Sequence, residues 1–377
     1  MSYLESYNIL YDLQHSFRSS RSCETQLISF IQDLSQSNNK NKQTDIIIMD
    51  FAKAFDKVSH KHLLYKLEYY GITCNAHKWI TDFLTQRTQT VVLEGVMSDK
   101  VPVTSGVPQG TVLGPILFLI YINDFADYIK HSTLRLFADD SIIYREVNNI
   151  DDAKLLQSDL EAAGRWEQDW LMHFHPDKCN IINITQKKNP THFHYKLHDH
   201  ILEKVESAKY LGVTIQNNLK WDKHINSITQ KANQSLGFLR RNLKINFQNV
   251  KEHAYKALVR PKLEYSSSVW DPYAKSQVNQ IEKVQRRAAR FVTNRFHNTS
   301  SVSDMLVSLN WPLLEIRRTR SRLIMFYKIV HGLVAIHPNP NLLVPNSSKT
   351  RQGQGTNLCT FRKISTTKDS YKHYFFP

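Results

Sequence analysis

Residues 136–144 read LFADDSIIY, in which two adjacent carboxylates, Asp139 and Asp140, lie between two apolar, β-prone segments. The wider stretch TLRLFADDSIIYRE (133–146) predicts a strand, a tight turn and a second strand. Aspartate is common in turns because its side chain can hydrogen-bond to the nearby backbone. Taken alone, the pair therefore indicates only an Asp-rich hairpin.

A further carboxylate follows another apolar segment upstream. The stretch TDIIIMDF (44–51) contains three consecutive isoleucines, which predict a strand buried on both faces, and Asp50 follows this run. If this strand and the hairpin share one sheet, Asp50, Asp139 and Asp140 converge at one edge. Three carboxylates held this close repel one another when no cation is present, whereas two bound cations make the arrangement favourable.

The size and charge of the chain restrict its class. Its 377 residues allow two or three domains, and a hydrophobic content of 41% is typical of a globular protein. The formal net charge of +15 favours a polyanionic partner such as nucleic acid. A generally basic protein without such a partner is the alternative.

The cysteines and the apolar segments exclude other classes. Cys23, Cys74, Cys179 and Cys359 form no C-x-x-C pair, so we expect reduced intracellular thiols rather than a zinc knuckle or disulfide framework. The N-terminus lacks the pattern of a signal peptide. The most apolar run, VLGPILFLIYI (112–122), is shorter than the roughly 20 residues of a membrane span and predicts a buried helix.

The remaining patterns divide the chain into a mixed part and a helical part. A polar loop is expected over 34–43, and Ser59 and Asn75 are expected as helix N-caps. Helices are predicted over 58–71, 75–87, 115–125, 150–171, 220–243, 278–292 and 313–333, a hairpin over 90–110, and strands over 178–184, 192–197 and 208–215. We therefore expect a mixed α/β domain over 1–215, a basic helical region over 216–340 and a polar, irregular tail over 341–377.

Five motifs occur in a characteristic order. They are DFAKAFDKV (50–58), SGVPQGTVLGPILFLIYINDF (105–125), FADD (137–140), HPDKCNI (175–181) and YLGVTI (210–215). This order resembles the polymerase core of reverse transcriptases from animal non-LTR (LINE-type, jockey- or CR1-like) retrotransposons. The resemblance covers most of the chain, from LQHSFRSSRSCETQL (13–27) through at least KVQRRAARFV (283–292).

The resemblance implies a fold and an activity. The fold is the α+β right-hand polymerase fold: a palm with an antiparallel sheet and packed helices, partial fingers, and then a helical thumb. The activity is RNA-directed DNA synthesis, in which dNTPs are added to a DNA primer on an RNA template. Two Mg²⁺ ions, or Mn²⁺ in their place, are the implied cofactors. The implied location is the nucleus or the cytoplasm, as a ribonucleoprotein without membrane association.

The resemblance also implies the catalytic residues. Asp50, the carbonyl of Phe51, Asp139 and Asp140 match the positions that hold metal ions in the family, with Asp140 less directly bound. Lys178 matches a family lysine that is thought to protonate the leaving pyrophosphate. Taken as an isolated residue, Lys178 could equally be a solvated surface lysine.

Other positions match residues that contact the nucleotide or the nucleic acid. Phe55 resembles the steric gate that rejects a ribose 2′-OH, with core packing as the alternative, while Gln109 and Arg18 resemble nucleotide contacts. Asp56 is expected to cap the segment that follows it. The implied nucleic-acid contacts are the hairpin residues Tyr210, Leu211 and Gly212 and the helical arginines Arg286, Arg287 and Arg290, for which a solvated basic face is the alternative.

Two features are left outside this scheme. Full-length elements of this kind carry an endonuclease and further fingers segments, so we expect a piece truncated at both ends. A catalytically inactive remnant that only binds RNA is therefore the alternative function.

In THFHYKLHDH (191–200), two pairs of alternating histidines, His192 with His194 and His198 with His200, favour a polar outer face over a metal site.

Overall fold

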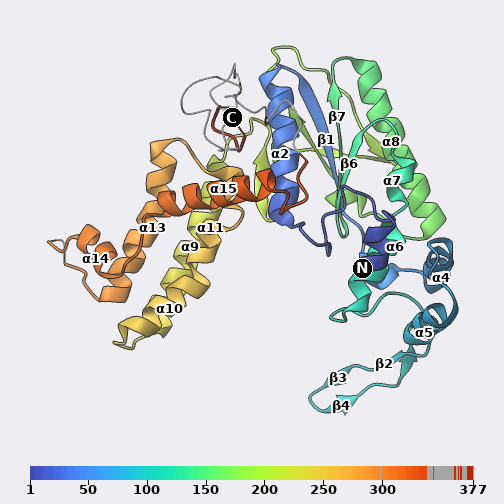
Figure 1. Ribbon diagram of the computed structural model, residues 1–377, viewed down its shortest axis with the longest axis horizontal. Helices are drawn as coiled ribbons and strands as arrows, with labels where there is room; N and C mark the ends of the chain where they lie inside the picture. The colour runs from blue at the N-terminus through green and yellow to red at the C-terminus, as the bar shows by residue number, and fades with distance from the viewer. Residues whose placement is uncertain are drawn as a thin grey trace. The chain divides into compact units, whose positions relative to one another are not determined.

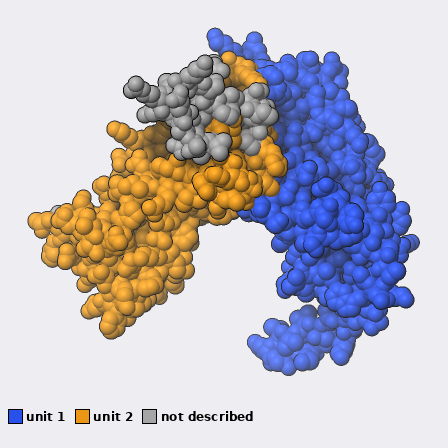
Figure 2. Space-filling view, in the orientation of Figure 1, with its two compact units in different colours: residues 1–26, 42–206 blue, residues 27–41, 207–377 orange. Residues whose placement is uncertain are grey.

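The computed structural model describes residues 1–297, 299–337, 343, 361, 364, 366 and 372–376. The chain forms two compact units, which Figure 2 colours separately. Unit 1 comprises residues 1–26 and 42–206, and unit 2 comprises residues 27–41 and 207–377. The expected domain limits at 215 and 340 stay predictions, and most of the expected tail over 341–377 lies outside the described residues.

A five-stranded sheet is the centre of unit 1. Its strand order is β11-β8-β1-β7-β6, and β1, β7 and β6 are seen side by side in Figure 1. All its pairs are antiparallel except β11 with β8, which are parallel, so the sheet is mixed where we expected an antiparallel one. The strands are β1 (Gln43–Met49), β6 (Thr133–Phe137), β7 (Asp140–Val147), β8 (Asn180–Ile184) and β11 (Glu203–Lys204).

The central strand and its hairpin neighbour follow the expected patterns. β1 lies between β7 and β8, and Ile46 and Ile47 are fully buried because both of their faces are covered. In the β6–β7 hairpin, Phe137 pairs with Asp140, which leaves two residues in the turn. The predictions of a buried strand and of a hairpin are confirmed.

Helices cover this sheet and give unit 1 its apolar core. α8 (Ile150–Trp170) packs against β7, and its N-cap Asn149 accepts a hydrogen bond from the Asp152 amide at 2.9 Å. α6 (Leu113–Ile122) is buried, as its apolar composition predicts. The remaining helices are α1 (Ser2–Ser6), α3 (Ala54–Lys57), α4 (His60–Tyr69), α5 (Cys74–Thr85), α7 (Phe125–Tyr128) and the 3₁₀ turn η1 (Pro176–Lys178).

Three local predictions need correction. The expected loop over 34–43 is wrong, because α2 (Cys23–Asn39) continues through most of it and β1 starts at its end. An apolar stripe at Leu27, Phe30, Ile31 and Leu34 is buried and continues the helix into the polar run. The expected strand over 192–197 reduces to β9 (Lys196–Leu197), paired with β10 (His200–Ile201), and α5 starts at Cys74 rather than after Asn75.

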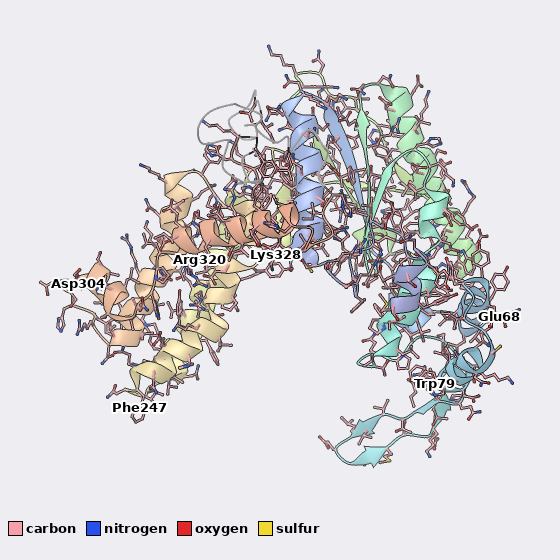
Figure 3. The ribbon with its side chains drawn as sticks, viewed as in Figure 1. Glu68, Trp79, Phe247, Asp304, Arg320 and Lys328 are labelled. Atoms are coloured by element: carbon pink, nitrogen blue, oxygen red, sulfur yellow. The ribbon has the colours of Figure 1, made fainter. Side chains whose placement is uncertain are left out.

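An exposed hairpin follows α5 in unit 1. Its strands are β2 (Thr88–Gln89), β3 (Val92–Leu93), β4 (Val96–Met97) and β5 (Val101–Pro102), as expected for this stretch. β2 pairs with β5 and β3 with β4, and Figure 1 shows this arm leading away from α5. On α5, the exposed Trp79, labelled in Figure 3, stacks on Phe83 with 5.8 Å between ring centroids.

Unit 2 is mostly helical. The short strands β12 (Ser207–Tyr210) and β13 (Val213–Gln216) form a hairpin before the helices, as expected. The predicted helices over 220–243, 278–292 and 313–333 are confirmed as α9, α13 and α15, and Figure 3 labels Arg320 and Lys328 on the last of them. The helices are α9 (Asp222–Asn242), α10 (Gln248–Leu258), α11 (Arg260–Glu264), α12 (Ser267–Trp270), α13 (Lys275–Thr293), α14 (Val302–Ser308) and α15 (Leu314–Val330).

The helix that carries the most apolar run does not resemble a membrane span. Within the part of the chain that the structure describes, no helix combines the length and apolarity needed to cross a bilayer. α6 instead packs against α4 in the core of unit 1.

Candidate active site

Asp50 directly follows β1 at one end of the sheet. The register pairs Met49 with Ser141, so Asp50 comes next to the start of β7. Its backbone carbonyl accepts a hydrogen bond from the amide of His175 at 2.8 Å. The backbone of Asp50 is therefore held between a central strand and the segment that precedes β8.

Asp139 lies in the two-residue turn between β6 and β7. The residue before it, Ala138, has a φ of +54°, whereas Asp139 has no positive φ, as in type II′ hairpin turns. Burial raises the pKa of the Asp139 carboxyl above its ordinary value, and the negative charge of Asp50 raises it further. These two carboxylates are thus brought together at one edge of the sheet.

Asp140 starts β7 and is exposed. Among the residues that the structure describes, no group of three or more His, Cys, Asp and Glu side chains is arranged to hold a metal ion. The expected convergence of three carboxylates is therefore found for Asp50 and Asp139, and the direct part of Asp140 in the site stays a prediction.

Lys178 lies beside Asp50. Its Nζ is 3.4 Å from Asp50 Oδ2, and its side chain is 63% exposed. The short turn η1 fixes its backbone, since the Lys178 amide donates to the carbonyl of His175 at 2.9 Å. An exposed lysine on a fixed backbone can contact both the carboxylate and a ligand bound beside it.

Phe51 is held rigidly beneath this edge. Its ring is buried and stacks on Phe174 with 4.3 Å between ring centroids, and Trp166 contacts it edge-on at 5.8 Å. The next amide, that of Ala52, donates to the carbonyl of His173 at 2.8 Å. The backbone around Phe51 therefore has one well-defined position, as a carbonyl ligand requires.

Phe55 and Gln109 lie near one another on two adjoining segments. Phe55 is half-buried and stacks on Phe118, with 4.3 Å between ring centroids and 17° between ring planes. Its carbonyl accepts from the Val107 amide at 2.9 Å, which ties it to the SGVPQG loop. The exposed Gln109 donates from Nε2 to Asp56 Oδ1 at 3.2 Å. The expectation that Asp56 caps the next helix is wrong, because Ser59 caps α4 instead.

Arg18 forms a buried ion pair within unit 1. Its Nε and Nη2 donate to the two carboxylate oxygens of Glu5 at 2.8 and 2.7 Å, and its Nη1 donates to the Tyr11 carbonyl at 2.7 Å. This bidentate pairing uses the same guanidinium donors that a triphosphate would need. The nucleotide contact expected for Arg18 stays a prediction, and the geometry favours a structural role.

The Arg18–Glu5 pair leads to a stability prediction. The Arg18 hydrogen bond lowers the pKa of Glu5, so the pair stabilises the fold above the ordinary glutamate pKa and loses this effect as pH falls through the lowered value. We expect Glu5→Gln to lower the free energy of unfolding by about 2 kcal/mol at pH 7 and by much less at acid pH. Urea titration at both pH values tests this. The exposed Asp12→Asn should leave both values unchanged.

The hairpin residues of unit 2 differ in exposure. The ring of Tyr210 is buried and meets Phe30 edge-on at 5.6 Å. Leu211 and Gly212 form the turn with φ values of +45° and +86°, and the Leu211 carbonyl accepts from Tyr265 Oη at 3.0 Å. Only the turn, not the tyrosine ring, is open to a nucleic acid.

The three arginines of α13 lie on its solvent side. Arg286 and Arg287 are exposed and Arg290 is half-buried. Arg287 donates to Asn233 Oδ1 at 3.0 Å, and Arg290 donates to the His297 carbonyl at 3.3 Å. These are neutral acceptors, so the positive charge of both arginines is not neutralised by those contacts.

The histidine cluster is dispersed. His192 and His194 are exposed outside any strand, whereas His198 Nε2 lies 2.8 Å from a Glu167 carboxylate oxygen. The other oxygen of Glu167 lies 3.0 Å from His173 Nδ1. Among the described residues, no group of these side chains is arranged to hold a metal ion here.

Comparison with known families decides the class of the chain. The family model for reverse transcriptase (RNA-dependent DNA polymerase) matches residues 1–215. The chain belongs to the reverse transcriptase family. The α+β polymerase fold expected from the motifs is confirmed by this match, together with the helix-covered sheet of unit 1.

Curated relatives from insect mobile elements agree with this membership. From Drosophila melanogaster, the RNA-directed DNA polymerase of mobile element jockey is 28% identical over 258 residues, covering 65% of this chain and 28% of the relative. The probable RNA-directed DNA polymerase of transposon BS is 28% identical over 305 residues, covering 76% and 33%. That of transposon X-element is 25% identical over 308 residues, covering 78% and 33%. The chain thus spans about a third of the length of these relatives.

Solved structures give weaker similarities. Telomerase from Candida albicans in complex with a TWJ fragment of telomeric RNA aligns with a TM-score of 0.46 and 13% identity, covering 83% of this chain and 57% of that one. Apo telomerase from Candida tropicalis aligns with a TM-score of 0.44 and 12% identity, covering 78% and 49%. Similarities at this level support no conclusion about this reverse transcriptase.

Two residues beside the site have no role assigned to them from the sequence. Phe174 supports the Phe51 ring, and Cys179 is buried, with its pKa raised to about 11 mainly by burial. The alternation in HFHPDKCN (173–180) is the only sequence signal that could have indicated which of these side chains face inward.

Proposed function

We propose that this chain is the polymerase part of a non-LTR retrotransposon protein, and that it adds dNTPs to the 3′-OH of a DNA primer on an RNA template. The observation that carries this proposal is the pairing of Asp50 and Asp139 at one sheet edge, with Lys178 within 3.4 Å of Asp50. Membership of the reverse transcriptase family supports the reaction class.

The donor set fits divalent cations, which members of this family generally use. Asp50, Asp139 and the Phe51 carbonyl are hard oxygen ligands, with Asp140 as a further carboxylate, and two Mg²⁺ ions are the expected occupants. The pKa of Asp139 is raised mainly by burial and further by the charge of Asp50, which supports a place for a cation between the two carboxylates. When bound, such ions lower the pKa of the primer hydroxyl and neutralise charge on the phosphates.

The protein residues around the carboxylates have separate roles. Asp50 and Asp139 would hold the ions that bring the reacting groups into line, since positioning supplies much of the catalysis of phosphoryl transfer. Lys178 places a positive charge, and a transferable proton, near the leaving pyrophosphate. The flat face of Phe55 packs beneath the sugar, while Gln109 and the SGVPQG loop contact the base pair that is being formed.

Positive charge outside the site would hold the nucleic acid. The net charge of +15 provides the general attraction, and Arg286, Arg287 and Arg290 present cations along one helix. The Leu211–Gly212 turn would contact the primer end. We further propose that the protein acts inside the cell as a ribonucleoprotein, in the nucleus or the cytoplasm.

Primer extension with metal removal tests the proposed function. On poly(rA) primed with oligo(dT), the purified chain should incorporate dTTP with Mg²⁺, lose all incorporation in excess EDTA, and recover it when Mg²⁺ is restored. Mn²⁺ should also restore it. Binding of the RNA, measured by filter retention, should persist in EDTA. Retention of RNA with no metal-dependent product would contradict the proposal and favour a remnant that only binds RNA.

The role of Lys178 leads to a second expected result. Lys178→Ala should lower kcat for dTTP incorporation about tenfold, because a cation beside the leaving pyrophosphate is lost, while the KM for dTTP changes little. Lys178→Arg keeps the charge but gives up its proton far less readily, so a rate near wild type would assign Lys178 an electrostatic role and a rate near that of Lys178→Ala a proton-donating one. Single-turnover incorporation measures the effect. Equal rates for wild type and Lys178→Ala would remove this residue from the mechanism.

A further inference from the structure

The segment before Arg18 runs alongside the strand that leads into the catalytic turn. The amide of His15 donates to the Leu136 carbonyl at 3.0 Å, and the Leu136 amide donates to the Leu13 carbonyl at 3.1 Å. These bonds make a parallel bridge between Gln14 and Leu136, one residue before Phe137. A residue from the N-terminal segment is thereby fixed next to the FADD turn.

The side chain of Gln14 bonds to the turn itself. Its Oε1 accepts a hydrogen bond from the Ala138 amide at 3.0 Å and a second one from the Ser16 amide at 3.0 Å. Only 2% of the residue is exposed, so water cannot replace either bond. The acceptor for the Ala138 amide, next to Asp139 in the chain, is therefore the side chain of Gln14.

The turn needs such support because its backbone is strained. Ala138 has a φ of +54°, a region that type II′ turns normally fill with glycine. A non-glycine residue in this conformation is strained and persists only where its surroundings fix it. By accepting a hydrogen bond from the Ala138 amide, Gln14 fixes the position of Ala138. The peptide that joins Ala138 to Asp139 is thereby fixed as well.

The anchor of Gln14 is itself rigid. The neighbouring His15 is buried, and its Nδ1 lies 2.9 Å from Thr25 Oγ1. Burial lowers the pKa of His15 to about 3, with further lowering from Arg135, Arg21 and Arg18, so the ring is neutral near pH 7. The segment that holds Gln14 is thus not expected to move with pH.

We propose that Gln14 is a positioning residue of the polymerase site, which sets the place of Asp139 relative to Asp50 by holding the Ala138 amide. This inference rests on the proposed function for its catalytic consequence. Its structural part concerns the turn alone and is tested separately. Gln14 touches no reacting atom and acts through the turn.

Three variants separate positioning from general stability. Gln14→Met keeps the length and removes the acceptor, whereas Gln14→Glu keeps an acceptor oxygen. Gln43→Met is the matched control, because Gln43 is also fully buried and accepts from a backbone amide, that of Thr191 at 2.8 Å. Gln43 lies at the end of β1 that is farther from Asp50, where it pairs with Val147 of β7.

The first measurement is hydrogen exchange over residues 137–141, in the absence of metal and nucleic acid. Gln14→Met should speed exchange of the Ala138 amide at least about tenfold, since a buried amide loses its acceptor. Gln14→Glu and Gln43→Met should leave exchange in this turn close to that of wild type. Unchanged exchange in Gln14→Met would overturn the proposal, whether or not the protein is a polymerase.

The second measurement is primer extension. Gln14→Met should lower kcat at least about tenfold with the KM for dTTP within about twofold, as loss of an outer-shell contact does at metal sites. Gln14→Glu should have most of the wild-type rate. Gln43→Met should also have the wild-type rate when each variant is assayed at the same temperature below its own Tm. Faster exchange in Gln14→Met with an unchanged kcat would overturn the positioning role. If wild type itself extends no primer, the proposed function fails, and the exchange result still decides whether Gln14 holds the turn.

Discussion

Asp139→Asn is expected to abolish primer extension, and at the same time to raise the Tm of the metal-free protein. The amide cannot supply the negative charge that attracts a cation, and loss of one such electrostatic group costs at least about 10²–10³-fold in rate. Binding of RNA should be unaffected, because the nucleic-acid contacts that we propose lie at other residues. Extension of oligo(dT) on poly(rA) measures the rate, and filter retention measures the binding.

The stability part of this result has a defined sign. The folded protein raises the pKa of Asp139 above its ordinary value of 3.8, through burial and the charge of Asp50. The neutral form therefore favours folding at low pH, and this contribution is lost as pH rises through the raised pKa. At pH 7 the ionised carboxylate is a cost that asparagine does not carry. The difference in Tm should vanish at acid pH.

Scanning calorimetry with and without Mg²⁺ completes this test. Mg²⁺ should raise the Tm of wild type and have a smaller effect on Asp139→Asn, since a ligand stabilises the state that binds it. Asp151→Asn, at an exposed carboxylate of α8, is the control and should leave Tm and rate unchanged. A full rate in Asp139→Asn would refute the two-carboxylate mechanism.

Phe55→Val is expected to let the protein incorporate ribonucleotides. The ring of Phe55 is held flat against Phe118, so it cannot swing aside for a 2′-OH. A smaller side chain opens that space. We expect the preference for dNTPs over rNTPs to fall roughly a hundredfold, which is about the discrimination that an apolar pocket can exert against an added hydroxyl. The dTTP rate itself should fall much less.

The ratio of kcat/KM for dTTP and UTP measures this discrimination. Phe83→Val is a suitable control, because Phe83 stacks on the exposed Trp79 of α5 rather than on Phe118. If Phe55→Val discriminates as well as wild type, Phe55 is a core residue and the gate lies elsewhere. A loss of all incorporation with an unchanged Tm would also contradict a gate role.

Local signals explain how much of this architecture the sequence predicts. The three isoleucines before Asp50 have no polar position that could face water, so a doubly covered strand follows directly. The FADD hairpin is equally local, since turn residues separate two β-prone segments. The candidate catalytic residues, by contrast, are indicated only by the order of the motifs, because each carboxylate alone is an ordinary turn residue.

Two of the contacts that the sequence did not predict join residues far apart in the chain or in separate segments. Nothing local indicates that Gln14 bonds to Ala138, because 124 residues separate them in the chain. Arg18 shows the same limit from the other side, since its pairing with Glu5 depends on how α1 folds back. In α2, the polar run after Leu34 suggested a loop, although the buried apolar stripe before it stabilises the helix through Asn39.

The buried thiol beneath Asp50 has a practical consequence for fluorescence work. With its pKa near 11 and no access to solvent, Cys179 should resist maleimides at neutral pH, while Cys74 at the start of α5 is exposed. In a Cys23→Ser, Cys359→Ser background, a dye could therefore be attached at Cys74 alone. Such a label would report on the N-terminal end of α5, while the sheet edge that carries Asp50 and Asp139 stays chemically untouched.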